Sequence, residues 1–132
     1  MPSRVLLVDD EIIVRDVLSA LLKRDGYEVF AADSGQDGLN LFRQSSRPIE
    51  LLVTDYNMPD MTGLELAREC SRLCGELRVL YVSGARPDEE LQADLQGRKR
   101  DFLSKPFRSD DLLRKARELL LVEPAGQLSA SP

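Results

Sequence analysis

The sequence predicts an α/β domain in which a parallel β-sheet carries helices on both faces, the arrangement called doubly wound. Short apolar segments alternate with amphipathic ones along the chain, five of each. The apolar segments are nearly continuous, which is typical of strands buried on both faces. With 132 residues, 42% hydrophobic and 5% aromatic, the chain suits one domain with an aliphatic core. Right-handed crossovers between parallel strands leave few other topologies.

The first three elements are predicted to be a strand, a helix and a strand. Arg4–Val8 is a continuous apolar run that ends in acid, as a buried parallel strand does. Glu11–Arg24 carries apolar side chains at helical spacing and stops at Asp25-Gly26, which indicates a helix. Tyr27–Ala32 is short and rich in β-branched and aromatic residues, so we expect the second strand there.

The middle of the chain predicts a second helix, a third strand and a long turn. Ser34 is placed to cap a helix that ends near Ser45-Ser46. Glu50–Thr54 is the next strand-like run, and it leads through an acid into a turn-rich stretch, Tyr56–Gly63.

The second half repeats the rhythm. Leu64–Leu73 has a helical pattern and Leu77–Val82 reads as a strand. A short helix is expected over Glu89–Gln96, followed by the last strand at Asp101–Ser104. Asp110–Val122 is strongly amphipathic and predicts the final helix.

Composition excludes several classes of function. The chain has no His, so it has no His-based general base or metal site and is not a phosphohistidine donor. Its net charge of −5 disfavours direct binding of nucleic acid. No run approaches the roughly 18 apolar residues that span a bilayer. Met1-Pro2-Ser3-Arg4 leads straight into a strand, so we expect no secretory signal and a cytoplasmic location.

Three local features have structural interpretations. Cys70 and Cys74 are four residues apart in a predicted helix, which indicates packing of free thiols on one helical face. Arg98-Lys99-Arg100 is expected to be a solvated loop between helix and strand. Residues 1–122 are predicted to form the domain, and Glu123–Pro132, rich in Pro, Gly, Ser and Ala, a flexible tail or linker.

Functional groups follow four of the five predicted strands. They are Asp9-Asp10-Glu11, Asp55, Ser83-Gly84 and Lys105-Pro106. In an open parallel sheet, ligands bind beyond the carboxyl ends of the strands, so we expect these groups to converge. Crowded carboxylates favour a cation, and hard oxygen ligands suit Mg²⁺, which also takes phosphate oxygens as ligands.

The same set suggests phosphoryl transfer to Asp55. A carboxylate can be a nucleophile that forms an aspartyl phosphate. Lys105 supplies a compact positive charge for a phosphate oxygen, and Ser83 a hydrogen bond to another. Each residue alone is ordinary; the specificity lies in their order and their strand-end placement.

At this point the sequence resembles the receiver domains of two-component response regulators. The matching pieces are Val8-Asp9-Asp10-Glu11, Thr54-Asp55-Tyr56-Asn57-Met58-Pro59, Met61-Thr62-Gly63, Ser83-Gly84 and Phe102-Leu103-Ser104-Lys105-Pro106-Phe107. The resemblance covers roughly Arg4–Val122 and implies a flavodoxin-like sheet of order 2-1-3-4-5.

The resemblance implies roles for the acidic set and the lysine. Asp55 matches the phosphoacceptor. Asp10 and Asp55 match ligands of Mg²⁺, which Mn²⁺ could replace, with Asp9 acting mainly through water and Asn57 through its backbone carbonyl. Lys105 matches the phosphate-binding lysine. The chain would not be an enzyme beyond catalysing its own phosphorylation and dephosphorylation.

The resemblance also implies a switch and partners. Ser83 matches the switch hydroxyl and Phe102 the switch aromatic, while Pro106 follows a peptide bond that is usually cis. Gly84 matches the small residue that leaves the phosphoryl group accessible. The donor would be a histidine kinase or a phosphotransfer protein.

A downstream protein would bind the family's output face. That face corresponds here to Asp88–Gln96, Asp101–Ser104 and Asp110–Val122. The chain would be a stand-alone receiver or one cut from a longer protein such as a hybrid kinase.

Three positions depart from the family pattern. Thr62 replaces the usual Asp before Gly63, but both residue types cap helices. Residues 96–100 replace the usual Gly-Ala before the last strand, so the family's form of the nearby helix and its output face is not carried over here. Phe102 lacks the hydroxyl of the Tyr common there.

Two other functions stay open on the residues alone. One is a binding module with the same fold that works without phosphorylation. Such proteins typically lose one of five residues that this chain keeps: Asp9, Asp10, Asp55, Ser83 and Lys105. The other is an aspartyl-phosphate phosphohydrolase. Those enzymes typically place the nucleophile after the first strand in an Asp-x-Asp pattern, which the adjacent pair Asp9-Asp10 breaks.

Overall fold

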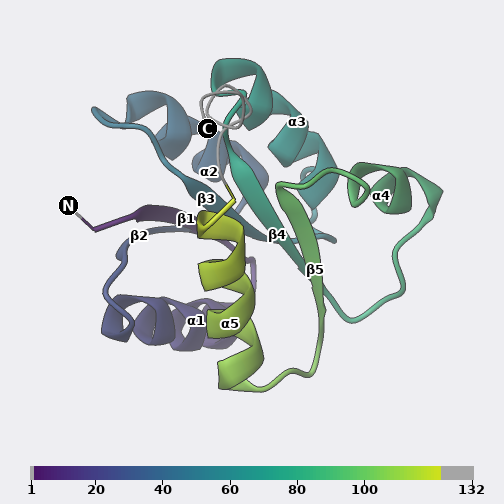
Figure 1. The fold of residues 1–132 in the computed structure, drawn as a ribbon. Coiled ribbons are helices and arrows are strands. Elements are labelled where there is room, and N and C mark those ends of the chain that lie inside the picture. The colour runs from purple at the N-terminus through teal and green to yellow at the C-terminus, as the bar shows by residue number, and fades with distance from the viewer. Residues whose placement is uncertain (1, 123–132) are drawn as a thin grey trace, which may run out of the picture.

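A single parallel sheet with five strands organises the molecule (Figure 1). The computed structural model describes residues 2–122, so the predicted tail, Glu123–Pro132, lies outside the described residues. The strands are β1 (Arg4–Val8), β2 (Glu28–Ala32), β3 (Leu51–Asp55), β4 (Arg78–Ser83) and β5 (Arg100–Ser104). Their order is β2-β1-β3-β4-β5, which confirms the predicted doubly wound topology.

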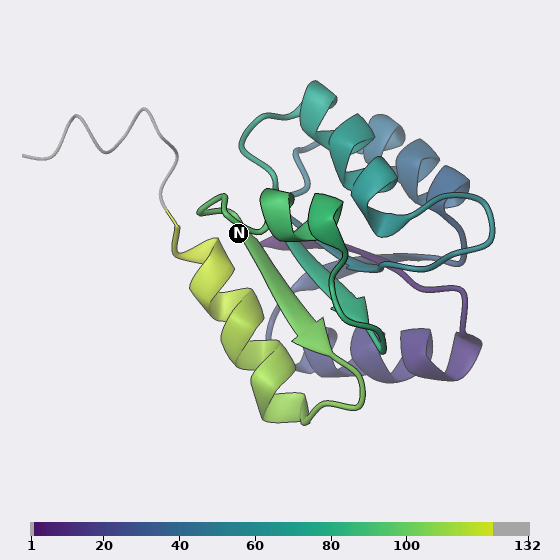
Figure 2. The ribbon, with the colours of Figure 1, turned by 90° about the vertical axis from the view of Figure 1, so that its right-hand side faces the viewer.

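Helices cover both faces of the sheet. They are α1 (Ile12–Arg24), α2 (Gly35–Gln44), α3 (Gly63–Leu73), α4 (Glu89–Asp94) and α5 (Ser109–Leu120). α1 and α5 lie on one face and α2 and α3 on the other, with α4 beside α3 at the β5 edge (Figure 2). None of the helices within residues 2–122 is long and apolar enough to cross a bilayer.

The strand side chains alternate between two cores although every residue of β1, β3 and β4 is buried. Leu6 and Val8 point into the core under α2, α3 and α4. Val5 and Leu7 point into the core under α1 and α5. This period of two explains why the strands read as continuous apolar runs: each face has a core of its own.

The predicted caps are confirmed. The Ser34 hydroxyl accepts a hydrogen bond from Asp37 N at 3.1 Å and begins α2. Thr62 accepts from Glu65 N at 3.1 Å, while the Glu65 carboxylate accepts from Thr62 N at 2.9 Å. This capping box begins α3, so Thr replaces the family's Asp without loss of the cap.

The cysteines behave largely as predicted. Both are free, and Cys70 is fully buried in the core beneath α3. Burial raises the pKa of its thiol to about 12, so the thiol stays protonated. Cys74 is half-buried and ends the helix rather than lying within it.

The basic segment Arg98-Lys99-Arg100 differs from its prediction as a solvated loop. Arg98 is exposed, but Lys99 binds Glu76 at 3.0 Å and Arg100 is the first residue of β5. The α4 helix also ends at Asp94, two residues before the predicted Gln96. Arg100 turns inward because its guanidinium has hydrogen-bond partners in α3, in α4 and in the segment just before β4.

We call these contacts the Arg100 network. The Arg100 guanidinium donates to Asp94 Oδ2 at 3.0 Å, Leu77 O at 2.9 Å and Ser71 Oγ at 3.1 Å. The fully buried Tyr81 donates its hydroxyl to the same Asp94 oxygen at 2.6 Å. The network therefore joins α3, β4, α4 and β5 at the corner where the family's output face would lie.

Candidate functional site

The predicted site residues meet at the carboxyl edge of the sheet. The carboxyl ends of β1, β3, β4 and β5 are aligned by the parallel pairs Val8↔Thr54, Asp55↔Val82 and Ser83↔Ser104. Asp9, Asp55, Ser83 and Lys105 therefore follow or end β1, β3, β4 and β5 at one edge.

Three acids and one lysine form the centre of this site. Carboxylate oxygens of Asp9, Glu11 and Asp55 all lie within 4.8 Å of one another. Lys105 Nζ lies 3.3 Å from Asp9 Oδ2, 3.4 Å from Glu11 Oε1 and 3.8 Å from Asp55 Oδ1. One ammonium thus faces three carboxylates, two of them buried: Asp9 is 1% exposed and Asp55 8%.

The charges at this site alter the pKa of Asp55. Burial raises the pKa of its carboxyl from 3.8 to about 6, Asp9 and Asp10 raise it too, and Lys105 only partly opposes them. For Lys105, burial lowers the pKa of the ammonium, but the nearby acids outweigh burial and raise it above its usual value. The site therefore has more negative charge than one lysine neutralises.

This arrangement fits a small divalent cation. The donors are carboxylate oxygens, the hard ligands that Mg²⁺ and Mn²⁺ prefer. A cation beside Asp55 would favour its ionised form, because an opposite charge lowers the pKa of a carboxyl.

Asp10 and Asn57 lie at the rim. Asp10 is exposed, yet its carboxyl is close enough to hydrogen-bond to that of Asp55 and raise its pKa. Asn57 is exposed in the β3–α3 loop, where its backbone bridges to Thr62. The predicted roles of both in binding metal stay predictions.

Ser83 and Phe102 occupy neighbouring strands. Ser83 is 2% exposed, its Oγ accepts from Ala85 N at 3.1 Å, and its carbonyl accepts from Lys105 N at 2.8 Å. Phe102 is half-buried, pairs in register with Tyr81 and packs against the core beneath α4. The Lys105-Pro106 peptide bond is cis, as the resemblance implied.

The loop between β3 and α3 is shaped by its own sequence. A Cβ added at Gly63 would lie 2.6 Å from Asp55 O, so only glycine lets α3 begin this close to the site. Asp60 accepts hydrogen bonds from Gly35 N at 3.1 Å and Gln36 N at 2.9 Å. These contacts hold the loop against the start of α2.

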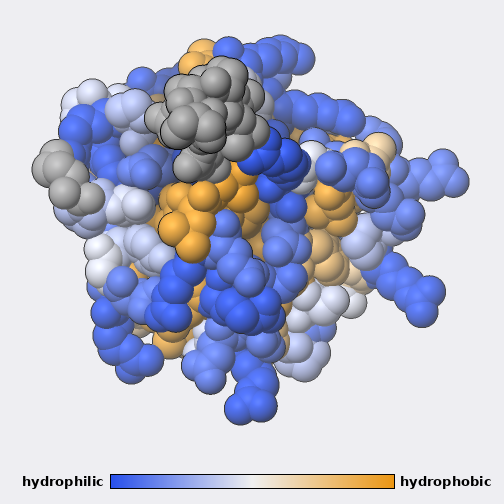
Figure 3. All heavy atoms as spheres, viewed as in Figure 1, coloured by the Kyte–Doolittle hydropathy of each residue, from blue (hydrophilic) through white to orange (hydrophobic). Residues whose placement is uncertain are grey.

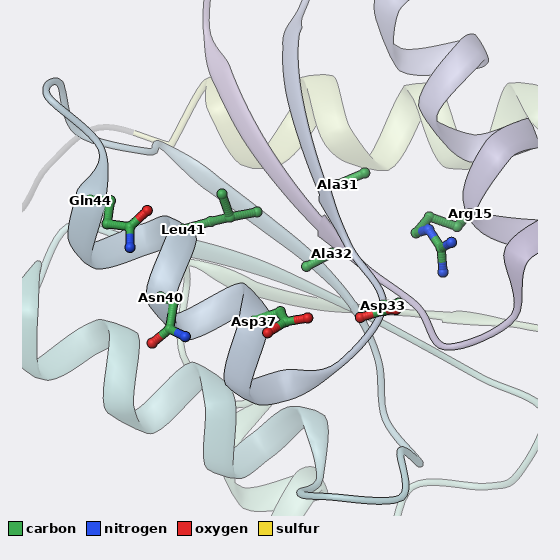
Figure 4. Close-up of a pocket in the computed structure, with 8 residues that line it drawn as sticks. All are labelled: Arg15, Ala31, Ala32, Asp33, Asp37, Asn40, Leu41 and Gln44. Atoms are coloured by element: carbon green, nitrogen blue, oxygen red, sulfur yellow. The ribbon is translucent and has the colours of Figure 1, made fainter.

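The structure adds Glu11 to the predicted set. Glu11 was noted only as part of the acidic run after β1, whereas its carboxylate lies in the central cluster. The signal available in the sequence was its place directly before α1, where it is the N-cap residue. A separate hollow of about 410 Å³ lies between β2 and α2, where Arg15, Asp33 and Asp37 surround it (Figure 4); it contains none of the predicted site residues.

Comparison with known families identifies the chain. The model of the response regulator receiver domain matches residues 5–117. The chain belongs to this receiver family. The receiver identity agrees with the acidic pocket of Asp9, Glu11 and Asp55 and with the sheet order.

Individual relatives share both sequence and fold with this receiver. It is 37% identical over 120 residues to the response regulator MprA of Mycolicibacterium vanbaalenii, covering 91% of this chain and 51% of MprA. The receiver thus spans about half the length of that relative. A receiver domain protein from Methanospirillum hungatei is similar in structure, with a TM-score of 0.81, 28% identity and coverage of 91% and 94% of the two chains.

A third relative was solved with ligands. The response regulator TrrA of Thermotoga maritima, in complex with Mg²⁺-BeF, has a TM-score of 0.73 and 29% identity to this receiver, over 89% of this chain and 98% of that one.

Proposed function

We propose that this receiver accepts a phosphoryl group on Asp55 and thereby switches the binding of a partner. The observation that carries the proposal is the buried Asp55 carboxylate, 3.8 Å from the Lys105 ammonium and clustered with Asp9 and Glu11. The acids around Asp55 carry more negative charge than Lys105 neutralises, so the site favours a divalent cation, and such a cation also binds phosphoryl oxygens. The chain is no enzyme in the usual sense, since the phosphoryl group ends on the protein itself.

The placement of these residues supports an in-line transfer. An Asp55 carboxylate oxygen attacks the phosphorus in line, a phosphorus–oxygen bond forms, and the bond to the donor breaks, with the electron pair leaving on the donor. Lys105 neutralises charge on the phosphoryl oxygens, and the Ser83 hydroxyl donates to one of them. A divalent cation held by the acidic residues would supply further positive charge at the site. Later attack by water returns Asp55 and releases phosphate.

The metal would be held by the acidic residues at the edge of the sheet. Asp10 and Asp55 contribute carboxylates, Asp9 acts mainly through water, and Asn57 contributes its carbonyl. Asp10→Ala should weaken Mg²⁺ binding by at least about tenfold, since a carboxylate ligand is lost. Isothermal titration calorimetry of the two proteins with MgCl₂ measures the difference, and equal affinities would contradict this ligand set.

The donor would be a histidine kinase or phosphotransfer protein in the cytoplasm. Next to Lys105, a hollow of about 480 Å³ is lined by the apolar side of α1 and by Phe107. Ile13 and Val17 border it and are 76% and 52% exposed. Apolar surface beside a phosphorylation site supports docking of the donor protein there.

The output partner would bind the face made by α4, β5 and α5. Figure 3, seen from the side on which α5, β5 and α4 face the viewer in Figure 1, shows a mostly hydrophilic surface with apolar atoms exposed between the polar side chains. Phosphorylation would change the charge next to Ser83 and draw Phe102 inward, which alters this face.

Incubation with acetyl phosphate and Mg²⁺, followed by intact-mass analysis, tests the proposal. The wild-type chain should gain one phosphoryl group, and Asp55→Asn should gain none. Asp33→Asn is a matched control, because Asp33 is an exposed acid outside the cluster, and it should be labelled like the wild type. A wild-type chain without an adduct, or an adduct that persists in Asp55→Asn, contradicts the proposal.

A further inference from the structure

The loop from β4 to α4, Gly84–Pro87, leaves the sheet beside Asp55. Asp55 pairs in register with Val82, so the loop starts one residue beyond Ser83 at the edge of the site. Gly84, Ala85 and Arg86 are exposed. The loop must therefore be positioned by contacts at its ends.

Both ends contact the two residues that follow Asp55. At the start, the Asn57 side-chain amide lies 3.5 Å from Ser83 Oγ, a long contact, and Ala85 N donates to the same oxygen. At the far end, the Tyr56 hydroxyl donates to Asp88 Oδ2 at 2.9 Å. The bond at the far end is the shorter of these two side-chain contacts.

Asp88 connects this bond to α4. Its other oxygen, Oδ1, accepts from Leu91 N at 2.9 Å and caps the helix. The Asp88 carboxylate thus joins Tyr56 to the start of α4, and the end of the loop moves with it.

The Tyr56 side chain is itself held firmly. Its ring packs edge-to-face on buried Tyr81, with centroids 6.4 Å apart and planes at 76°. Its backbone N donates to Val82 O at 2.9 Å, and its carbonyl accepts from Gly63 N at 2.7 Å. Tyr56 is therefore a fixed support between the phosphoacceptor and the end of the loop.

We propose that Tyr56 is a positioning residue that, by binding Asp88, holds the β4–α4 loop beside Asp55 and slows hydrolysis of the phosphoryl group. The inference rests on the proposed function. In hydrolysis a water oxygen attacks phosphorus, the bond from phosphorus to Asp55 breaks with its electron pair returning to the carboxylate, and the water proton leaves with phosphate or solvent. The Tyr56 hydroxyl binds Asp88 rather than Asp55, so it acts through the loop. The loop, held in place, restricts the access of that water to the phosphorus on Asp55.

Tyr56→Phe removes the hydroxyl and keeps the ring on Tyr81. After labelling with acetyl phosphate and Mg²⁺ and removal of the reagent, the adduct should decay about fivefold faster than in the wild type, the change in rate expected from loss of one hydrogen bond. The rate of labelling should change less than the rate of decay. Intact-mass analysis over time measures both.

Asp88→Ser separates the loop contact from the helix cap. Serine caps helices as well as aspartate does, but its hydroxyl is too short to reach Tyr56. This variant should decay as fast as Tyr56→Phe, and the double variant no faster than either, because all three lack the same bond. Tyr27→Phe is the matched control, since within residues 2–122 the Tyr27 hydroxyl has no hydrogen-bond partner, and it should decay at the wild-type rate.

The outcomes separate this inference from the proposed function. An adduct that decays at the wild-type rate or more slowly in Tyr56→Phe overturns the role of Tyr56 and leaves Asp55 as phosphoacceptor. Acceleration in Tyr56→Phe but not in Asp88→Ser also overturns it, because the effect would then not pass through Asp88. A wild-type chain that takes no phosphoryl group overturns both.

Discussion

Two polar clusters in this receiver are built in opposite ways. At the carboxyl edge of the sheet, Asp9, Glu11 and Asp55 share one cation, Lys105, at 3.3–3.8 Å. In the Arg100 network, one guanidinium pairs with one carboxylate, that of Asp94. Its other two nitrogens donate to Leu77 O and Ser71 Oγ.

The difference distinguishes a reactive site from a cluster that only stabilises the fold. Burial, together with the neighbouring acids, raises the pKa of Asp55 to about 6, so the ionised carboxylate is unfavourable until a cation binds. The Arg100 network has matched partners and needs nothing further. The first cluster should therefore become more stable when an acid is removed, and the second less stable when any member is lost.

The largest expected effect comes from breaking the Arg100 network. Arg100→Met should lower the free energy of unfolding by about 3 kcal/mol, because Asp94, Leu77 O and Ser71 lose their donor in a largely buried place. Urea denaturation measures it. Arg98→Ala removes an exposed neighbour of the same charge and should change stability by less than about 0.5 kcal/mol. Equal losses in the two variants would mean that the network does not stabilise the fold.

Removing the charge of Asp55 should have the opposite sign. The pKa of its carboxyl is about 6 when folded and 3.8 ordinarily, so the folded state binds its proton more tightly and ionisation opposes folding. This penalty is absent below about pH 4 and fully present above about pH 6. Without metal, Asp55→Asn should therefore gain about 2 kcal/mol at neutral pH and almost nothing at about pH 4. A gain independent of pH, measured by urea denaturation at both values, would contradict this origin.

Replacing Lys105 tests whether its positive charge competes with a metal ion for the acidic cluster. Lys105→Ala should bind Mg²⁺ about tenfold more tightly, because the ammonium no longer repels the cation. Lys115→Ala is the control, as Lys115 binds Asp101 at 3.0 Å outside the acidic cluster. Calorimetric titration with MgCl₂ compares them, and weaker binding to Lys105→Ala would show that Lys105 organises the acids rather than competing with the metal.

The smallest effect should come from a single hydroxyl of the Arg100 network. Tyr81→Phe keeps the buried ring and should lose about 1 kcal/mol of stability in urea denaturation. Combined with Arg100→Met, the loss should be less than additive, because both side chains donate to Asp94 Oδ2. Strict additivity would mean that the two contacts act independently.

The sequence predicted the sheet and the acidic edge because both depend on local pattern and on general topology. Continuous apolar runs marked the strands, and the parallel order carried Asp55 and Lys105 to one edge. It did not predict that Arg100 turns inward, because a basic triplet before a strand looks the same whether it contacts solvent or the half-buried Asp94. Two of the partners of Arg100, Ser71 in α3 and Leu77 just before β4, lie 29 and 23 residues away along the chain.

The sequence by itself determined the fold class, the receiver family and the chemistry available at the carboxyl edge, since these follow from residue type, periodicity and order. Only the tertiary structure decided that Glu11 joins the acids, that Tyr56 reaches Asp88 and that Arg100 turns inward. Each of these depends on distances between elements that are remote in the chain. Such distances are set by packing of the two cores, which no local pattern encodes.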